Sequence, residues 1–301
     1  MSLLVTGSIG IDTVQTPHGS VEGVLGGSAV YFSFAAAPFT PVRLVATVGE
    51  DFPDEFRQVL AKRGIDLAGL ETRVGSKTFR WSGRYEGDMN AAETVDVSLN
   101  VLAEAAPNVP EAFADSRVVF LANTHPTLQR ELLAQIRTPQ LTVCDTMNLW
   151  IENEREALLA TLAAVDGIII NDGEARQLTG QMNLIDAARA IRDFGPRFVV
   201  IKKGEHGALL ATEDEITVIP ARPTADVRDP TGAGDSFAGG MLGYLAAEGR
   251  CDGQTLRRAL LRGTVTASFA IERFSLNGLR DRTKADIDER VAALSRMLSI
   301  N

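Results

Sequence analysis

Six short runs of apolar, largely β-branched residues recur along the chain, with helix-like segments between them. They are LLVTG (3–7), VRLVATVG (42–49), RVVFLAN (117–123), LTVCD (141–145), GIIIN (167–171) and FVVIKKG (198–204). Several are apolar throughout, which is typical of strands buried on both faces of a parallel sheet. Alternation of such strands with helices predicts a doubly wound α/β sheet. Because no repeat, linker or low-complexity tract interrupts the pattern, we expect one domain over residues 1–301.

One segment, KTFRWSGRYEG (77–87), follows a different pattern. Alternation places Phe79, Trp81 and Tyr85 on one face of a strand, with polar and basic side chains on the other. A strand with two unlike faces does not fit a sheet buried on both sides. The segment therefore predicts an accessory sheet, a flap or a dimer contact, and the alternative is an ordinary antiparallel edge hairpin.

Composition narrows the class of function. The chain has 30 basic and 39 acidic residues, a net charge of −9, and no basic run, so we expect no nucleic-acid partner. Two cysteines do not make a disulfide framework. The first residues lack the pattern of a signal peptide, and no apolar stretch approaches the roughly 20 residues that span a bilayer. We therefore expect a cytoplasmic protein with no membrane partner.

The most specific motif is DPTGAGDSFAGG, which runs from Asp229 to Gly240. Its glycines allow tight backbone geometry, and a helix-like apolar pattern follows. Free amides at a helix start attract anions, and they would stabilise charge on a transferred phosphoryl group. Asp235 stands in the same first turn, where an ionised carboxylate could accept a hydroxyl proton. The alternative is a glycine-rich helix cap with an acidic first-turn residue.

Other phosphate and metal motifs are absent from the sequence. There is no GxxxxGK[ST] sequence and no GxGxxG sequence after a strand, which argues against a P-loop or dinucleotide site. Three scattered histidines without HExxH argue against a zinc hydrolase. The ends of the predicted strands are polar and rich in glycine. They indicate one ligand-binding site along the carboxyl edge of the sheet.

The motif closely resembles the C-terminal signature of the ribokinase-like (PfkB) family of carbohydrate and nucleoside kinases. GGSAVYFSFAA (26–36) resembles the family's N-terminal glycine-pair signature, and NDGE (171–174) resembles its Asn-x-x-Glu motif. The resemblance covers essentially the whole chain. It implies a three-layer α/β/α fold with a mostly parallel sheet and a small β-lid, with lid elements at about residues 12–24 and 76–98.

The resemblance also implies transfer of the γ-phosphoryl group of ATP to a hydroxyl, with Mg²⁺ as cofactor. Asp235 would be the base, and the amides of Gly232, Ala233 and Gly234 would form the anion hole. The implied nucleotide residues are Asn171, Glu174, Lys203, Gly204 and Thr231, of which Asn171 and Glu174 would hold Mg²⁺ through water. Asp229 and Thr231 match positions that in some members help hold a monovalent cation such as K⁺, and whether this chain binds one stays open.

For the acceptor, the resemblance points to Asp12, whose carboxylate can take two hydroxyls at once. The full set of expected acceptor residues is Asp12, Gly26, Gly27, Ser28, Arg80, Asp145 and Asn148. Many sugar-kinase members carry asparagine after the glycine pair, whereas this chain has Ser28. This departure leaves the identity of the acceptor open.

Three functions follow from these observations. The first is an ATP-dependent kinase that phosphorylates a small sugar or sugar derivative. The alternative is a nucleoside kinase of the same family, which Ser28 and stacking by Phe79 or Trp81 would favour. The third is a non-catalytic sugar or nucleotide sensor, against which the intact Gly-Ala-Gly-Asp sequence argues. A homodimer through the lid would suit the aromatic strand, and a monomer is the alternative.

Overall fold

The computed structural model describes residues 1–299 and contains a large sheet of nine strands in the order β13-β12-β11-β10-β9-β8-β1-β4-β5. The strands are β1 (Leu3–Thr6), β4 (Val42–Gly49), β5 (Ile65–Arg73), β8 (Val118–Leu121), β9 (Leu141–Cys144), β10 (Gly167–Asn171), β11 (Phe198–Lys202), β12 (Ala208–Ala211) and β13 (Ile216–Ile219). All pairs are parallel except those that β12 forms with β11 and with β13. The predicted doubly wound, mostly parallel sheet is confirmed, and each of the six apolar runs supplies one strand.

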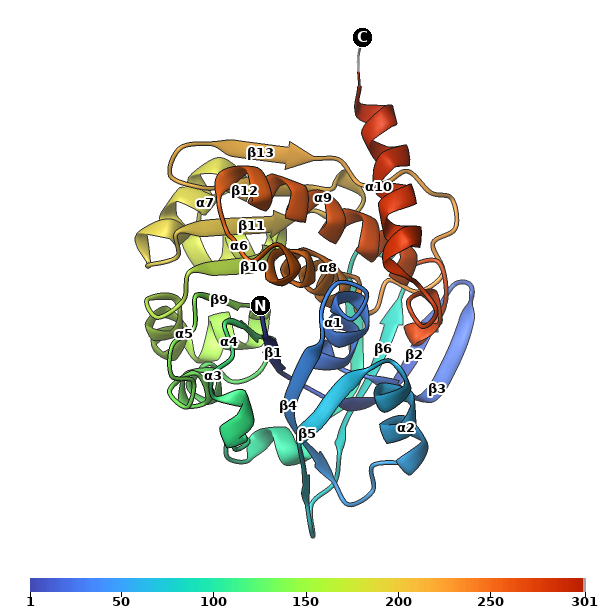
Figure 1. Ribbon diagram of the computed structural model, residues 1–301. Coiled ribbons are helices and arrows are strands. Elements are labelled where there is room, and N and C mark those ends of the chain that lie inside the picture. Colours follow the sequence, from blue (N-terminus) through green and yellow to red (C-terminus); the bar gives the residue numbers. More distant parts are fainter. Residues whose placement is uncertain (300–301) are drawn as a thin grey trace.

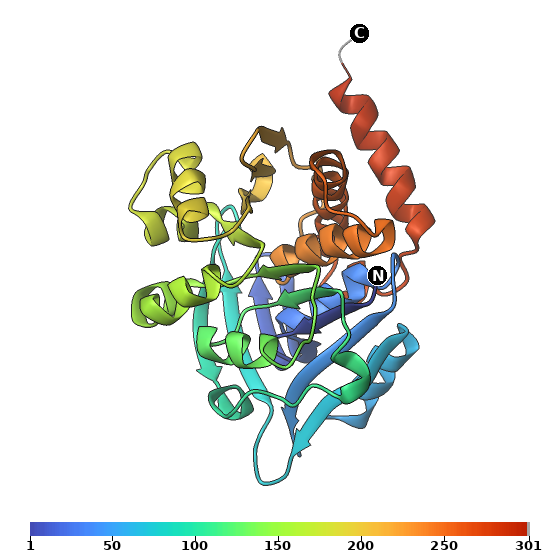
Figure 2. The ribbon, with the colours of Figure 1, turned by 60° about the vertical axis from the view of Figure 1, so that its left-hand side comes forward.

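Helices cover both faces of this sheet, which gives the predicted three layers (Figures 1 and 2). One group comprises α1 (Ser28–Ala36), α2 (Asp54–Lys62), α8 (Ala233–Glu248), α9 (Gly253–Ala270) and α10 (Lys284–Leu298). The other comprises α3 (Pro126–Leu133), α4 (Asn148–Asn153), α5 (Arg155–Leu162), α6 (Asp172–Thr179) and α7 (Leu184–Asp193). In β1, Leu3 and Val5 join the core under the first group, while Leu4 joins the core under the second. This division follows from the alternation of side chains along a strand.

Short 3-10 helices complete the connections at η1 (Asn100–Ala103), η2 (Glu111–Phe113), η3 (Gly204–His206) and η4 (Ser275–Gly278). Within residues 1–299, no helix is both long and apolar enough to cross a bilayer.

A second, small sheet has the strand order β3-β2-β6-β7 and carries the alternating segment. Its strands are β2 (Gly10–Thr16), β3 (Gly19–Gly26), β6 (Phe79–Tyr85) and β7 (Ala92–Ser98). Its inner face carries Asp12, Val14, Trp81, Tyr85 and Val97, and its outer face carries Ile11, Thr13, Arg80, Ser82 and Asp96. The inner face packs against Val227, in the loop that leads to α8. The small sheet therefore stands beside the start of α8.

Two glycines let α8 lie directly against α1. A Cβ atom on Gly239 would lie 2.3 Å from the carbonyl oxygen of Phe32, and one on Gly243 would lie 2.9 Å from Cα of Ala36. Such backbone neighbours cannot move aside as the end of a flexible side chain can. The glycines therefore set the separation of the two helices and, with it, the position at which α8 begins.

We predict that Gly239→Ala lowers the free energy of unfolding by about 1–3 kcal/mol, because the added methyl group forces α1 and α8 apart. The matched control is Gly253→Ala in α9, where the nearest atom to a new Cβ is a flexible Glu215 oxygen at 3.6 Å. We expect this control to change stability by about 1 kcal/mol or less. Urea unfolding measures both, and equal midpoints for the two variants would contradict the packing argument.

Candidate active site

The turn before α8 places backbone amides at the carboxyl edge of the large sheet. Gly232 is left-handed (φ 70°) and precedes the first residue of the helix. A Cβ atom there would lie 2.2 Å from the Tyr31 ring, so only glycine fits. No side chain caps this helix start. The amide of Ala233 donates to the Pro230 carbonyl, whereas those of Gly232 and Gly234 have no acceptor within residues 1–299. The predicted anion hole thus retains two free donors.

Asp235 lies in the first turn of α8, beside these amides. Burial, the main cause, and the charge of Asp145 together raise the pKa of its carboxyl to about 7, against the opposing effect of Lys202. A carboxyl with a pKa near neutrality can be ionised at physiological pH and still take a proton effectively. This property suits the role of base that the sequence predicts for Asp235.

Lys202 is a site residue that the sequence reading did not select. It is the last residue of β11, and its register partner is Asn171, at the end of β10. Its Nζ lies 3.8 Å from Oδ2 of Asp145 and 2.8 Å from the place that a Cβ on Gly234 would occupy. Lys203, the neighbour that we predicted, follows the strand and forms a backbone hydrogen bond with Gly207. The ammonium group at the helix start is therefore that of Lys202.

Asn171 and Glu174 form a capping box at the start of α6. The backbone amide of Asn171 donates to Glu174 Oε2 at 2.8 Å, and the backbone amide of Glu174 donates to Asn171 Oδ1 at 2.7 Å. Burial raises the pKa of Glu174 to about 7, with a smaller contribution from Asp145. No three acidic, histidine or cysteine side chains within residues 1–299 lie close enough to hold a metal ion directly. The residues present fit Mg²⁺ through water, with one Glu174 oxygen left for that purpose.

The acceptor end centres on Asp12, on the inner face of the small sheet. Asp12 is 3% exposed, and its Oδ1 has no hydrogen-bond partner within residues 1–299. Burial, the main cause, raises its pKa to about 7, with smaller contributions from Asp229 and Asp235 and against a hydrogen bond from the Gly27 backbone. An unpaired buried oxygen is costly unless a ligand satisfies it. Asp12 is therefore suited to accept a hydroxyl.

The glycine pair lies against this carboxylate. A Cβ on Gly26 would lie 1.8 Å from Oδ2 of Asp12, and Gly27 has a φ of 101°. Ser28, a predicted acceptor residue, bonds reciprocally with Ser8 through its backbone amide and its hydroxyl at 2.9 to 3.1 Å. The hydroxyl is thus hydrogen-bonded inside the protein and joins the segment that follows β1 to the start of α1.

Asp229 and Thr231 lie under the same turn. The two oxygens of Asp229 accept the amides of Thr231 at 2.9 Å and of Ser275 at 2.8 Å. The Thr231 hydroxyl donates to the hydroxyl of Tyr85, at 3.3 Å, and so connects the turn to β6. Each Asp229 oxygen keeps a further lone pair. These oxygens would therefore suit a monovalent cation beside the turn.

Three predicted acceptor residues do not gather around Asp12. Arg80 points from the outer face of the small sheet and pairs with Asp51 at 2.9 Å. Asp145 is buried beside Lys202, and Asn148 is exposed at the start of α4. The alternation of β6 explains Arg80, because its neighbours Phe79 and Trp81 take the inner face.

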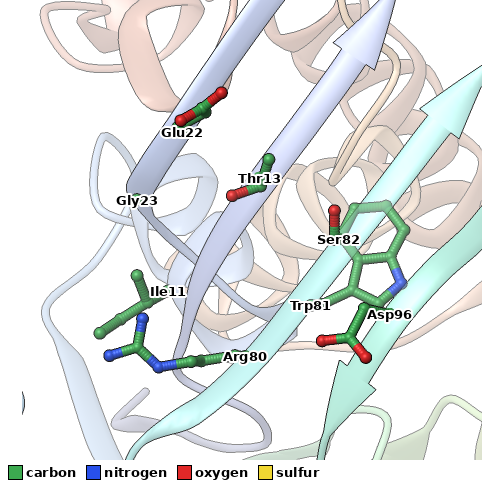
Figure 3. A pocket seen from close by; sticks show the side chains of 8 residues that line it. All are labelled: Ile11, Thr13, Glu22, Gly23, Arg80, Trp81, Ser82 and Asp96. Carbon is green, nitrogen blue, oxygen red and sulfur yellow. The ribbon is translucent and has the colours of Figure 1, made fainter.

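The outer face of the small sheet is hollowed. A hollow of about 400 Å³ is lined by Ile11, Thr13, Glu22, Gly23, Arg80, Trp81, Ser82 and Asp96 (Figure 3). Most of these residues lie on the face of the sheet opposite Asp12, while Trp81, the register partner of Asp12, also contributes to the lining. The homodimer expected from the sequence would use this face, and it stays a prediction.

Comparisons with known proteins extend these observations. The model of the pfkB family carbohydrate kinases matches residues 3–281. A cytidine kinase from Thermococcus kodakarensis is 32% identical over 252 residues, which cover 81% of this chain and 88% of that protein. Its similarity extends well beyond the short signature motifs.

Solved structures share the fold across almost the whole chain. A nucleoside kinase from Methanocaldococcus jannaschii superposes with a TM-score of 0.78 at 20% identity, covering 97% of this chain and 99% of the other. A fructokinase double mutant from Vibrio cholerae, with fructose, ADP and potassium bound, superposes with a TM-score of 0.80 at 19% identity, covering 97% and 98%. Fold, motif order and family match agree, and the chain belongs to the PfkB family of carbohydrate kinases, with a ribokinase-like fold.

Proposed function

We propose that the protein transfers the γ-phosphoryl group of ATP to a hydroxyl of a nucleoside. The observation that best supports this reaction is the arrangement at the start of α8. Free backbone amides, the ammonium group of Lys202 and the carboxyl of Asp235 lie together there. The similarity to a cytidine kinase over 81% of the chain supports a nucleoside rather than a free sugar as acceptor. The sugar acceptor that the sequence first favours is the second candidate, because Asp12 would bind sugar hydroxyls equally well.

In the proposed reaction, the acceptor hydroxyl loses its proton to Asp235 as its oxygen bonds to the γ-phosphorus. The bond from that phosphorus to the bridging oxygen of ADP breaks, and the free amides of Gly232 and Gly234 stabilise the charge that develops. Asp12 holds the acceptor in line for this attack. The contribution of the chain is positioning and electrostatics, which suffices for a loose phosphoryl-transfer transition state.

The remaining nucleotide residues have supporting roles in this proposal. Mg²⁺, bound with ATP, would neutralise phosphate charge, and Asn171 and Glu174 would hold it through water. Lys203, Gly204 and Thr231 would contact the nucleotide. A Cβ on Gly204 would lie 2.6 Å from Oδ1 of Asn90, in the turn between β6 and β7, so the small sheet reaches the nucleotide loop. A monovalent cation such as K⁺ would lie at Asp229 and Thr231.

The inner face of the small sheet supports a nucleoside. Trp81 is the register partner of Asp12 on one side and of Val97 on the other, so the three side chains form a row across the sheet. Val97 is 49% exposed. A sugar bound at Asp12 would direct an attached base toward this aromatic and apolar surface. Residues 12–24 and 76–98 then act together as the lid.

The first test is an acceptor panel assayed by ADP release with ATP and Mg²⁺. We expect turnover with cytidine or another nucleoside, and a kcat/KM at least about tenfold above that for ribose, fructose or other free sugars, corresponding to about 1.4 kcal/mol of transition-state binding. Turnover of free sugars alone would contradict the nucleoside proposal. Nucleotide binding without turnover of any acceptor would instead favour the sensor.

Asp235→Asn tests the base. We expect kcat to fall by about 10²–10⁴-fold, while the Kd for ATP changes by less than about threefold. The matched control is Asp186→Asn, an exposed acid in the first turn of α7. Near-normal turnover in Asp235→Asn would remove Asp235 from this role.

The same variant has a stability signature. The folded pKa of about 7 exceeds the ordinary value of 3.8, so folded protein holds more protons than unfolded protein between about pH 4 and 7. Stability contributed by this group is therefore present at low pH and falls as pH rises to 7. We expect Asp235→Asn to raise the urea midpoint more at pH 8 than at pH 4.5, and the opposite order would contradict the pKa assignment.

Trp81→Leu tests the lid surface. Because base–aromatic stacking contributes about 1–3 kcal/mol, we expect the KM for the nucleoside to rise at least about fivefold, with the KM for ATP unchanged. Trp81→Phe keeps a ring and should stay close to wild type. An unchanged nucleoside KM in Trp81→Leu would contradict contact between Trp81 and the base.

A further inference from the structure

One ammonium group stands among three carboxyls at the phosphoryl end of the site. The charges of three carboxyls act on Lys202: Asp145 at the end of β9, which lies 3.8 Å from Nζ, Glu174 of α6 and Asp235 of α8. Burial opposes its charge, but the three carboxyls together raise its pKa above the ordinary value, so the ammonium form persists at neutral pH. The lysine in turn offsets part of the rise that burial causes in the pKa of each of these carboxyls.

The geometry distinguishes Lys202 from an ordinary structural ion pair. The distance of 3.8 Å from Nζ to Asp145 Oδ2 exceeds hydrogen-bond reach, although it is short enough for charge attraction. Within residues 1–299, Nζ makes no hydrogen bond of 3.5 Å or less, its ion-pair partner is the Asp145 carboxylate, and the side chain is 17% exposed. An ammonium carries three donors. Lys202 therefore keeps donors for a ligand.

Those donors point to the anion hole. Nζ lies 2.8 Å from the place that a Cβ on Gly234 would occupy, and the Gly234 amide is free. A phosphoryl oxygen at the start of α8 would therefore meet both the amide and the ammonium. A side chain on Gly234 would occupy this space, which explains why the position is a glycine although its backbone is helical.

We propose that Lys202 is a further catalytic residue, whose ammonium binds the transferred phosphoryl group, and that Asp145 is the residue that positions it. The inference rests on the proposed function. During transfer the acceptor oxygen bonds to phosphorus, the bond to ADP breaks, and the acceptor proton passes to Asp235. Lys202 keeps its protons throughout and offsets the negative charge on the phosphoryl oxygens. Asp145 holds the ammonium in place before ATP binds.

Lys202→Met is the principal variant, with Lys62→Met, on the exposed surface of α2, as control. We expect kcat/KM to fall by about 10²-fold or more, the loss typical of removing one preorganised donor. Lys202→Arg should recover part of this loss, and unfolding midpoints identify any variant that is misfolded. If Lys202→Met retains more than about a third of wild-type kcat/KM while folded, the proposal is overturned.

The pH profile separates catalysis from structure. Lys202 lowers and Asp145 raises the pKa of Asp235. The acid limb of the kcat/KM profile should therefore move to higher pH in Lys202→Met and to lower pH in Asp145→Asn. Acid limbs that do not move, or that both move in one direction, contradict the assigned roles.

Nucleotide binding tests Lys202 without any acceptor. Wild-type protein should bind a non-hydrolysable ATP analogue more tightly than ADP, and Lys202→Met should lose this preference at least about tenfold while its Kd for ADP stays within threefold. Loss of preference in a protein that phosphorylates nothing would refute the proposed function but support the role of Lys202. An unchanged preference alongside normal wild-type turnover would refute the role of Lys202 alone.

Discussion

The contact between α1 and α8 fixes the geometry on which the site depends. Gly239 and Gly243 bring the two helix backbones together, and Gly232 places the start of α8 against the Tyr31 ring. The amides of the first turn, Asp235 and the ammonium of Lys202 then have positions set by packed helices and strands rather than by a free loop. Phosphoryl transfer needs such preorganised groups, because it relies on positioning and electrostatics.

The site also contains buried carboxyl groups, and burial makes their charged forms unfavourable in the folded protein. Asp12, Glu174 and Asp235 all have a pKa raised to about 7, mainly by burial. A single lysine offsets part of this charge near the phosphoryl end, and nothing within residues 1–299 satisfies Oδ1 of Asp12 at the other end. Ligands that bring hydroxyls and cations would relieve this imbalance, so binding and stability are coupled at the same residues.

The sequence predicts much of this arrangement, and its failures have physical causes. Continuous β-branched apolar runs identify six of the nine strands. The other three lack that signal: β5 and β13 carry partly exposed positions along their length, and β12 is a buried Ala-Leu-Leu-Ala run without a β-branched residue. Adjacent Lys202 and Lys203 look equivalent in the sequence. Their side chains point in different directions, since a shift of one residue reverses the face of a strand, and the sequence does not show which of them reaches the site. Arg80 faces away from Asp12 for the same reason. The hydroxyl of Ser28 is taken by Ser8, a partner 20 residues away.

The central claim is that these groups transfer phosphate to a nucleoside. A competition assay tests it most directly, with ATP, Mg²⁺ and an equimolar mixture of cytidine, ribose and fructose, and with products identified by mass spectrometry. We predict that a nucleoside monophosphate is the main phosphorylated product, formed in a one-to-one ratio with ADP. A phosphorylated free sugar as the main product, or ADP formed at the same rate without any acceptor, would contradict it.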